Sequence, residues 1–186
     1  MVVLGITGGI ACGKSLVMEH FRRLGAYCID CDAIVDALYK RKDIQERLIK
    51  EFGTANKKEL SRLVFKDLAL RKKLEAIIQP EVIKELKREL AKAKKQSRLI
   101  AVEVPLLFEL SLENLFDAIV VVKASRELQI RRLMESGLTE QEALERINAQ
   151  MPLEEKVKKA DFVIDNSSAR EGIAKIVEKI FFKVTG

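Results

Sequence analysis

Apolar and polar residues follow two recurring patterns along the chain. Short, almost continuous apolar runs predict buried parallel strands at residues 2–7, 99–104, 117–122 and 161–164. Residues 27–32 form one further short strand that runs into a turn. Between the strands, apolar residues recur at the three- and four-residue spacing of amphipathic helices. Strands that alternate with helices predict an α/β fold with a doubly wound, five-stranded parallel sheet.

The longest stretch without a convincing strand covers residues 33–98. Helical periodicity recurs there at residues 33–39, 43–52, 57–68, 70–78 and 82–93. Gly53 and Pro80 are expected to separate helices, because both residue types interrupt helical backbone. We therefore predict a single domain in which a helical substrate-binding insertion, at about 33–98, interrupts a core. The core segments are residues 1–32, 99–124 and 160–186.

A second helical segment, residues 125–159, is predicted to contain two helices with Gly137 between them. It is rich in basic side chains, namely Arg126, Arg131, Arg132 and Arg146. This place in the chain suits an arginine-bearing lid over a phosphoryl-transfer site, although each arginine can also be read as an exposed helix-surface residue. A final amphipathic helix at residues 168–182 is predicted to close the sheet.

A complete phosphate-binding motif follows the first strand. Gly8, Gly9, Ile10, Ala11, Cys12, Gly13, Lys14 and Ser15 match G-x-x-x-x-G-K-[ST]. Its glycines let the backbone point N–H groups at phosphate oxygens, and the following helix adds the positive end of its dipole. Lys14 is placed to reach the β- and γ-phosphates, and the Ser15 hydroxyl to ligate Mg²⁺. The motif leaves the acceptor open: water in a GTPase or ATPase, a hydroxyl or phosphate in a kinase.

Two aspartates follow the second predicted strand. Period-two alternation places Asp30 and Asp32 on one side, at the carboxyl end of a strand beside the phosphate loop. This pair is the best candidate for a general base, with helix capping as the alternative, especially for Asp30. His20, the only histidine, lies in the first helix and is not predicted to act in the chemistry. Cys28 and Cys31 lack a second ligand pair, so no metal or redox site is predicted there.

Composition limits the class of protein and its location. The chain has 186 residues, 48% hydrophobic and 33% charged, with a formal net charge of +6. Most of the excess charge lies in residues 84–98, which contain seven basic and two acidic residues on the predicted outer face of a helix. We interpret these as a solvated face, with a general attraction for anionic substrates as the alternative, and expect no nucleic-acid partner.

No apolar run approaches the roughly 18 residues of a membrane span, and a strand at the N-terminus leaves no place for a charged leader. The three cysteines suit a reducing compartment. These features predict a cytoplasmic protein with no membrane partner.

Several separate stretches resemble one family, the dephospho-coenzyme A kinases. Residues 5–15 resemble its extended phosphate loop, residues 29–32 its I-D-A-D stretch, and residues 74–80 its L-E-x-I-x-H-P stretch. Residues 104–109 resemble its P-L-L-F-E turn. Residues 129–132, 150–156 (Q-M-P-L-E-E-K) and 160–166 (A-D-F-V-I-D-N) resemble its C-terminal signature. The resemblance covers nearly the whole chain in the family's order.

The resemblance implies transfer of the ATP γ-phosphoryl group to the ribose 3′-hydroxyl of dephospho-coenzyme A, with Mg²⁺ as cofactor. It implies a catalytic set of Asp32 as proton acceptor, with Lys14 and Arg132 balancing charge. It implies ATP contacts from Gly8, Gly9, Ile10, Ala11, Cys12, Gly13, Lys14, Ser15, Leu16, Arg132 and Asn166. It implies acceptor contacts from Thr7, Asp32, Arg62, Gln79, Leu106, Leu107 and Phe108. A monomer or small homo-oligomer is expected.

The alternatives are another small P-loop kinase, acting on a nucleoside, nucleotide or metabolite, and a nucleotide-dependent switch that binds nucleic acid through its basic helix. The chain also departs from the family pattern. Gln79 replaces the usual histidine, Ser136 lies where many members have a second lid arginine, and Ser168 replaces a glycine. Cys12 stands where serine or a small residue is common. At a helix N-terminus, which favours thiolate, Cys12 is predicted to be oxidisable.

Overall fold

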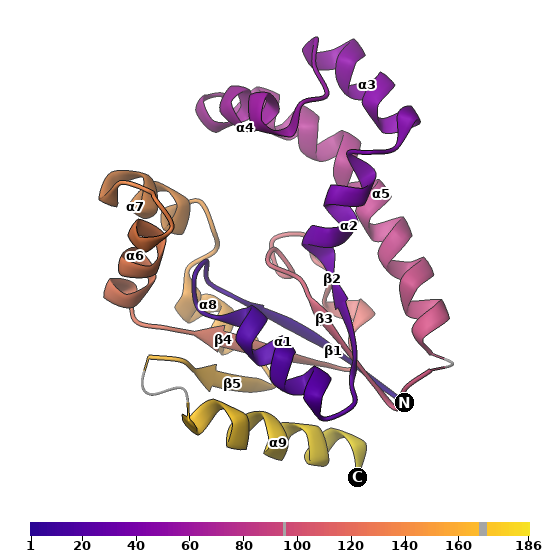
Figure 1. The fold of residues 1–186 in the computed structure, drawn as a ribbon, viewed down its shortest axis with the longest axis vertical. Helices are drawn as coiled ribbons and strands as arrows, with labels where there is room; N and C mark the ends of the chain where they lie inside the picture. Colours follow the sequence, from indigo (N-terminus) through magenta and orange to yellow (C-terminus); the bar gives the residue numbers. More distant parts are fainter. Residues whose placement is uncertain (95, 168–170) are drawn as a thin grey trace. The chain divides into compact units, whose positions relative to one another are not determined.

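Five strands form one sheet in the order β2-β3-β1-β4-β5 (Figure 1). The computed structural model describes residues 1–94, 96–167 and 171–186. The strands are β1 (Val2–Gly8), β2 (Tyr27–Asp30), β3 (Leu99–Glu103), β4 (Ala118–Lys123) and β5 (Phe162–Asp165). β1 pairs in parallel with both β3 and β4, which places Leu4 beside Ala101 and Ala118. The predicted five-stranded parallel sheet is confirmed.

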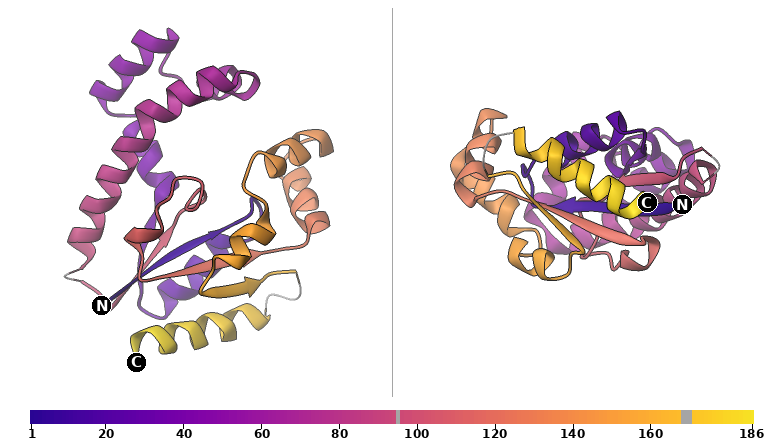
Figure 2. Two further views of the ribbon diagram at one scale, coloured as in Figure 1. Left: turned by 180° about the vertical axis from the view of Figure 1, so that it is seen from behind. Right: turned by 90° about the horizontal axis from the view of Figure 1, so that it is seen from below.

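Met1–Ile29 and Ala93–Gly186 form the first of two compact units, called the sheet unit below. Its helices are α1 (Lys14–Arg23), the 3₁₀-helix η1 (Glu113–Leu115), α6 (Arg126–Glu135), α7 (Glu140–Asn148), α8 (Leu153–Lys158) and α9 (Glu171–Thr185). α1 and α9 lie on one face of the sheet and α8 on the other (Figure 2). Phe21 of α1 and Val177 of α9 are fully buried in a core shared with Ile6 of β1.

Asp30–Lys92 form the second unit, called the helical unit. It contains α2 (Cys31–Leu38), α3 (Lys42–Phe52), α4 (Lys57–Lys66) and most of α5 (Leu68–Ala93). Its small core joins Ile44 and Leu48 of α3 to Leu60 of α4 and Ile78 of α5. The expected helix end at Gly53 is confirmed, because Gly53 closes α3 with φ 73°.

The expected break at Pro80 is wrong, because α5 runs through it without interruption. Contacts on both sides hold the helix together. Ile78 is buried before the proline, and after it the Glu81 carboxylate forms ion pairs with Arg41 at 3.2 Å and Arg47 at 3.6 Å. These contacts hold the helix against α3 on both sides of Pro80.

Several element boundaries differ from the sequence prediction. The strand expected to reach residue 32 ends at Asp30, which caps α2, and α2 begins at Cys31. The segment 125–159 contains α8 in addition to its two predicted helices, since six residues are too few for a clear periodic signal. The final helix is described from Glu171; Ser168 lies outside the described residues. Within the described part of the chain, no helix has both the length and the apolarity to span a membrane.

Candidate functional site

The phosphate-binding motif forms the loop between β1 and α1. Gly8 and Gly13 have φ of 147° and 90°, a range that L side chains rarely adopt. A Cβ atom on Gly13 would lie 2.1 Å from Asn166 Nδ2, and one on Gly8 would lie 2.0 Å from the Val122 carbonyl oxygen. Both glycines are therefore required by conformation and by close approach.

Side chains from three parts of the sheet unit bind the loop carbonyls. The donors and acceptors are Lys14 Nζ with Gly9 O at 3.1 Å, Arg132 Nη1 with Ala11 O at 2.9 Å, and Asn166 Nδ2 with Cys12 O at 2.8 Å. Carbonyl oxygens repel phosphate, whereas successive backbone N–H groups attract it. By engaging these carbonyls, the three side chains favour a loop conformation suited to an anion.

Asn166, one of the expected ATP contacts, supports the phosphate loop through its side chain. It is 1% exposed, its backbone N–H donates to Lys123 O at 2.8 Å, and its side chain supports the loop. Asn166 Oδ1 is buried without a hydrogen-bond partner in the described structure. Asn166 therefore shapes the loop from beneath it.

Ser15 lies in the first turn of α1 with an exposed side chain, and Leu16 follows it half-buried. No cluster of three or more His, Cys, Asp or Glu side chains suited to a metal ion occurs among the described residues. Mg²⁺ in phosphoryl-transfer sites is usually held by one or two protein groups together with substrate phosphates. The exposed Ser15 hydroxyl at the end of the loop fits this mode of binding.

The two aspartates do not share one side of a strand, so that prediction is wrong. Asp30 Oδ1 accepts the backbone N–H of Asp32 at 2.8 Å and caps α2, which confirms the capping alternative for Asp30. Asp32 lies in the first turn of α2 with its side chain exposed. Asp32 remains the candidate base, and it belongs to the helical unit.

The expected acceptor contacts fall in both units. Arg62 is exposed on α4 and Gln79 is half-buried on α5, both in the helical unit. In the sheet unit, Thr7 is buried and its Oγ1 donates to Pro105 O at 3.3 Å. Leu107 and Phe108 are buried at 0% and 3% exposure, while Leu106 is half-buried. The turn thus offers Leu106 and its backbone, rather than the Leu107 side chain, to a ligand.

A buried ion pair behind this turn was missed by the sequence interpretation. Lys156 of α8 is fully buried, and its Nζ lies 2.8 Å from Glu109 Oε1 and donates to Pro105 O at 3.2 Å. The Met151 N–H donates to the same Glu109 oxygen at 3.1 Å. A buried charge requires such partners. The available signal was that Glu109 and Lys156 both lie inside the motifs quoted above.

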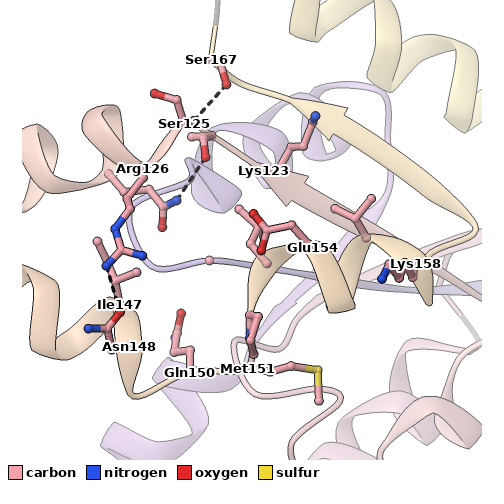
Figure 3. A pocket seen from close by; sticks show the side chains of 16 residues that line it. Lys123, Ser125, Arg126, Ile147, Asn148, Gln150, Met151, Glu154, Lys158 and Ser167 are labelled. Atoms are coloured by element: carbon pink, nitrogen blue, oxygen red, sulfur yellow. Dashed lines mark hydrogen bonds between the residues drawn. The ribbon is translucent and has the colours of Figure 1, made fainter.

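A pocket of about 720 Å³ opens between α6, the α7–α8 connection and the end of β4, and Gly9 of the phosphate loop borders it (Figure 3). Arg126 Nη2 donates to Asn148 Oδ1 at 3.0 Å on one side, and the Ser125 N–H donates to Ser167 Oγ at 3.0 Å on another. Gln150 lines the pocket near the loop. No motif or periodic pattern indicates this cavity, whose lining comes from segments far apart in the sequence, from Gly9 to Ser167.

The prediction that Cys12 favours thiolate is wrong. The Cys12 side chain is 0% exposed in the core between β1 and α1. Burial raises the pKa of the Cys12 thiol, and the opposing effect of the Lys14 charge is smaller. A protonated thiol is a poor nucleophile, so this position lacks the chemistry of a redox sensor.

A strand–loop–helix phosphate motif in a parallel sheet of order 2-3-1-4-5 defines a P-loop nucleotide-binding protein of the kinase type. The comparisons identify the family. The model of the family described as "Dephospho-CoA kinase" matches residues 2–171 of this chain. The chain belongs to the dephospho-CoA kinase family, and it is therefore a phosphotransferase.

Individual relatives agree with this assignment. The dephospho-CoA kinase of Aquifex aeolicus is 36% identical over 191 residues, covering 98% of this chain and 97% of the relative. Among solved structures, TT1252 from Thermus thermophilus superposes with a TM-score of 0.85 at 36% identity, covering 100% of this chain and 98% of the other. A dephospho-CoA kinase from Campylobacter jejuni superposes with a TM-score of 0.73 at 27% identity, covering 98% and 96%.

Proposed function

We propose that this protein transfers the γ-phosphoryl group of ATP to the ribose 3′-hydroxyl of dephospho-coenzyme A, giving coenzyme A and ADP in the final step of coenzyme A biosynthesis. Membership of the dephospho-CoA kinase family over residues 2–171 is the observation that carries the proposal. The phosphate loop with its carbonyls held by Lys14, Arg132 and Asn166 supports the ATP half of the reaction.

Lys14 and the loop N–H groups that follow Ile10, whose own N–H is bonded to Gln150, would bind the phosphates. Ser15 would hold Mg²⁺ when it is bound. That ion supplies positive charge to the β- and γ-phosphates. Arg132 would balance charge on the transferring group. Its guanidinium has five N–H donors, and the Ala11 carbonyl engages one nitrogen at 2.9 Å, so donors remain for a phosphoryl oxygen.

Asp32 would orient the 3′-hydroxyl and accept its proton. As the hydroxyl oxygen bonds to the γ-phosphorus, the bond to the β–γ bridging oxygen breaks and its electron pair leaves with ADP. The proton moves to the Asp32 carboxylate and is later released to water. This role requires the helical unit, which carries Asp32, Arg62 and Gln79, to bring the acceptor to the nucleotide. A lid movement of residues 125–159 is part of the same proposal.

The basic face of α5 and the free cysteines support the remaining proposals on partners and location. The basic residues of α5 are exposed and partly neutralised by neighbours, as in Lys92 with Glu89 at 2.6 Å and Arg88 with Glu85 at 3.8 Å. This supports a solvated face without a nucleic-acid partner; Lys95 lies outside the described residues. The free cysteines Cys12, Cys28 and Cys31 support a cytoplasmic location. A monomer or small homo-oligomer without a membrane partner completes the proposal.

The proposal is tested by an assay that couples ADP release to a spectroscopic signal, with Mg²⁺ and ATP present. Dephospho-coenzyme A, AMP, adenosine and shikimate are compared as acceptors, and a reaction without acceptor serves as the control. Release of ADP well above the control is expected with dephospho-coenzyme A alone. Equal or faster turnover of another acceptor would favour a different small P-loop kinase.

A further inference from the structure

Gln150 binds the phosphate loop from outside the motif. It lies in the connection between α7 and α8, and its Oε1 accepts the Ile10 N–H at 2.8 Å. The Lys14, Arg132 and Asn166 contacts all fix loop carbonyls, whereas Gln150 fixes an N–H group. The Gly9 carbonyl and the Ile10 N–H belong to one planar peptide group, so Lys14 and Gln150 hold that group from its two edges and together fix its orientation.

The segment that carries Gln150 is itself anchored. Residues 150–156, called the strap below, are joined to Glu109 by the Met151 N–H at 3.1 Å and by Lys156 Nζ at 2.8 Å. Lys156 is fully buried, so its position is fixed by packing as well as by charge. The amide oxygen of Gln150 is thus presented to the loop by a segment with little freedom to move.

The strap also connects to the strand that leads into the loop. Pro105 O accepts hydrogen bonds from Lys156 Nζ at 3.2 Å and from Thr7 Oγ1 at 3.3 Å. Thr7 immediately precedes Gly8, the first residue of the motif. Both ends of the stretch from Thr7 to Ile10 are therefore held by one network that includes the buried ion pair.

We propose that Gln150 is a positioning residue for the nucleotide: by accepting the Ile10 N–H, it holds the phosphate loop in its binding conformation before ATP or ADP arrives. A loop that is ordered in advance loses less conformational entropy when its ligand binds, so affinity is higher. The role assigned to Gln150 is to position the loop, with no contact to the reacting atoms or to the acceptor assigned to it. The inference rests on the proposed function only in requiring that the loop binds an adenine nucleotide.

The first test is equilibrium binding of Mg·ADP by calorimetry to wild type, Gln150→Met and Gln141→Met. Methionine keeps the length of the side chain but removes the acceptor. Gln141 is an exposed residue of α7, so its variant is a matched control. We expect Gln150→Met to raise Kd about fivefold, the effect of one lost hydrogen bond, and Gln141→Met to leave it unchanged. An unchanged Kd in Gln150→Met, or an equal rise in both variants, would overturn the inference.

The second test is hydrogen exchange at the Ile10 amide, measured by NMR. Gln150→Glu keeps an acceptor oxygen within reach, so wild type and this variant should protect the amide while Gln150→Met exchanges at least about tenfold faster. Equal protection in Gln150→Met would overturn the inference even if that variant were less stable. Neither measurement needs an acceptor. Absence of turnover with dephospho-coenzyme A would therefore refute the proposed reaction, while the binding and exchange results would still test the role of Gln150.

Discussion

Asn166 Nδ2 donates a hydrogen bond of 2.8 Å to the carbonyl oxygen of Cys12, joining the end of β5 to the phosphate loop across 154 positions of sequence. The same nitrogen lies 2.1 Å from the position that a Cβ atom on residue 13 would occupy, which is too close for any side chain there. Residue 13 must therefore be glycine because the buried Asn166 side chain packs directly against it. The loop is shaped by a distant strand as well as by its own glycines.

Replacing Asn166 with alanine should leave the buried Cys12 carbonyl without its donor. We expect the free energy of unfolding to fall by about 1–3 kcal/mol, the usual effect of an unsatisfied buried polar group, together with weaker ATP binding. Urea denaturation and calorimetry measure the two effects. Asn148→Ala, at an exposed position of α7, should lie within about 0.5 kcal/mol of wild type. A stable Asn166→Ala with wild-type affinity would contradict the assigned role.

Asp32→Asn should reduce turnover by about 10²- to 10⁴-fold, because an amide cannot accept the hydroxyl proton. ATP affinity should be nearly unchanged, since the loop contacts are made by other residues. Asp30→Asn is the matched control: asparagine caps a helix as well as aspartate does, so turnover should remain near wild type. Near-normal turnover in Asp32→Asn would remove this carboxylate from the mechanism.

Removing one partner of the Lys156–Glu109 ion pair should lower the free energy of unfolding more than removing both partners. Lys156→Met leaves the half-buried Glu109 carboxylate without its cation, so we expect the free energy of unfolding to fall by about 3 kcal/mol, the lower end of the range for a buried pair. The double variant Lys156→Met/Glu109→Gln should recover part of this loss, because no unpaired charge remains. Urea denaturation of wild type, both single variants and the double variant gives the coupling energy. Additive losses would show that the two charges do not depend on each other.

Peroxide should inactivate wild type and Cys12→Ala at the same rate. The Cys12 thiol is fully buried and its pKa is raised, so thiolate, the reactive form, is scarce at neutral pH. Residual activity is measured against time of exposure at fixed peroxide concentration. Slower inactivation of Cys12→Ala would restore the redox interpretation.

The parts that the sequence predicted well have local causes. The phosphate motif fixes a turn through its glycines, and the apolar strand runs fix a parallel sheet. Asp30 shows where a local rule was ambiguous: the same residue satisfies a strand pattern and a helix cap, and the hydrogen bond to Asp32 N–H decides for the cap. Pro80 shows a local preference overridden in the folded chain, since α5 runs through it and packs against α3 on both sides of it.

The contacts around the phosphate loop could not be predicted from sequence. Arg132, Gln150 and Asn166 lie more than a hundred residues from their partners, and no periodic pattern specifies such pairs. Lys156 carries a charge, which favours exposure in any sequence interpretation, yet the pairing with Glu109 buries it completely.

We propose that one phosphoryl group passes from ATP to one hydroxyl of dephospho-coenzyme A. The most direct measurement incubates the protein with Mg²⁺, dephospho-coenzyme A and ATP labelled with ¹⁸O in its γ-phosphoryl group, followed by mass spectrometry and phosphorus NMR of the product. We expect coenzyme A that carries the labelled phosphoryl group on the ribose 3′-oxygen, with one ADP formed per molecule of product. Labelled inorganic phosphate without coenzyme A, or phosphate on another oxygen, would contradict it.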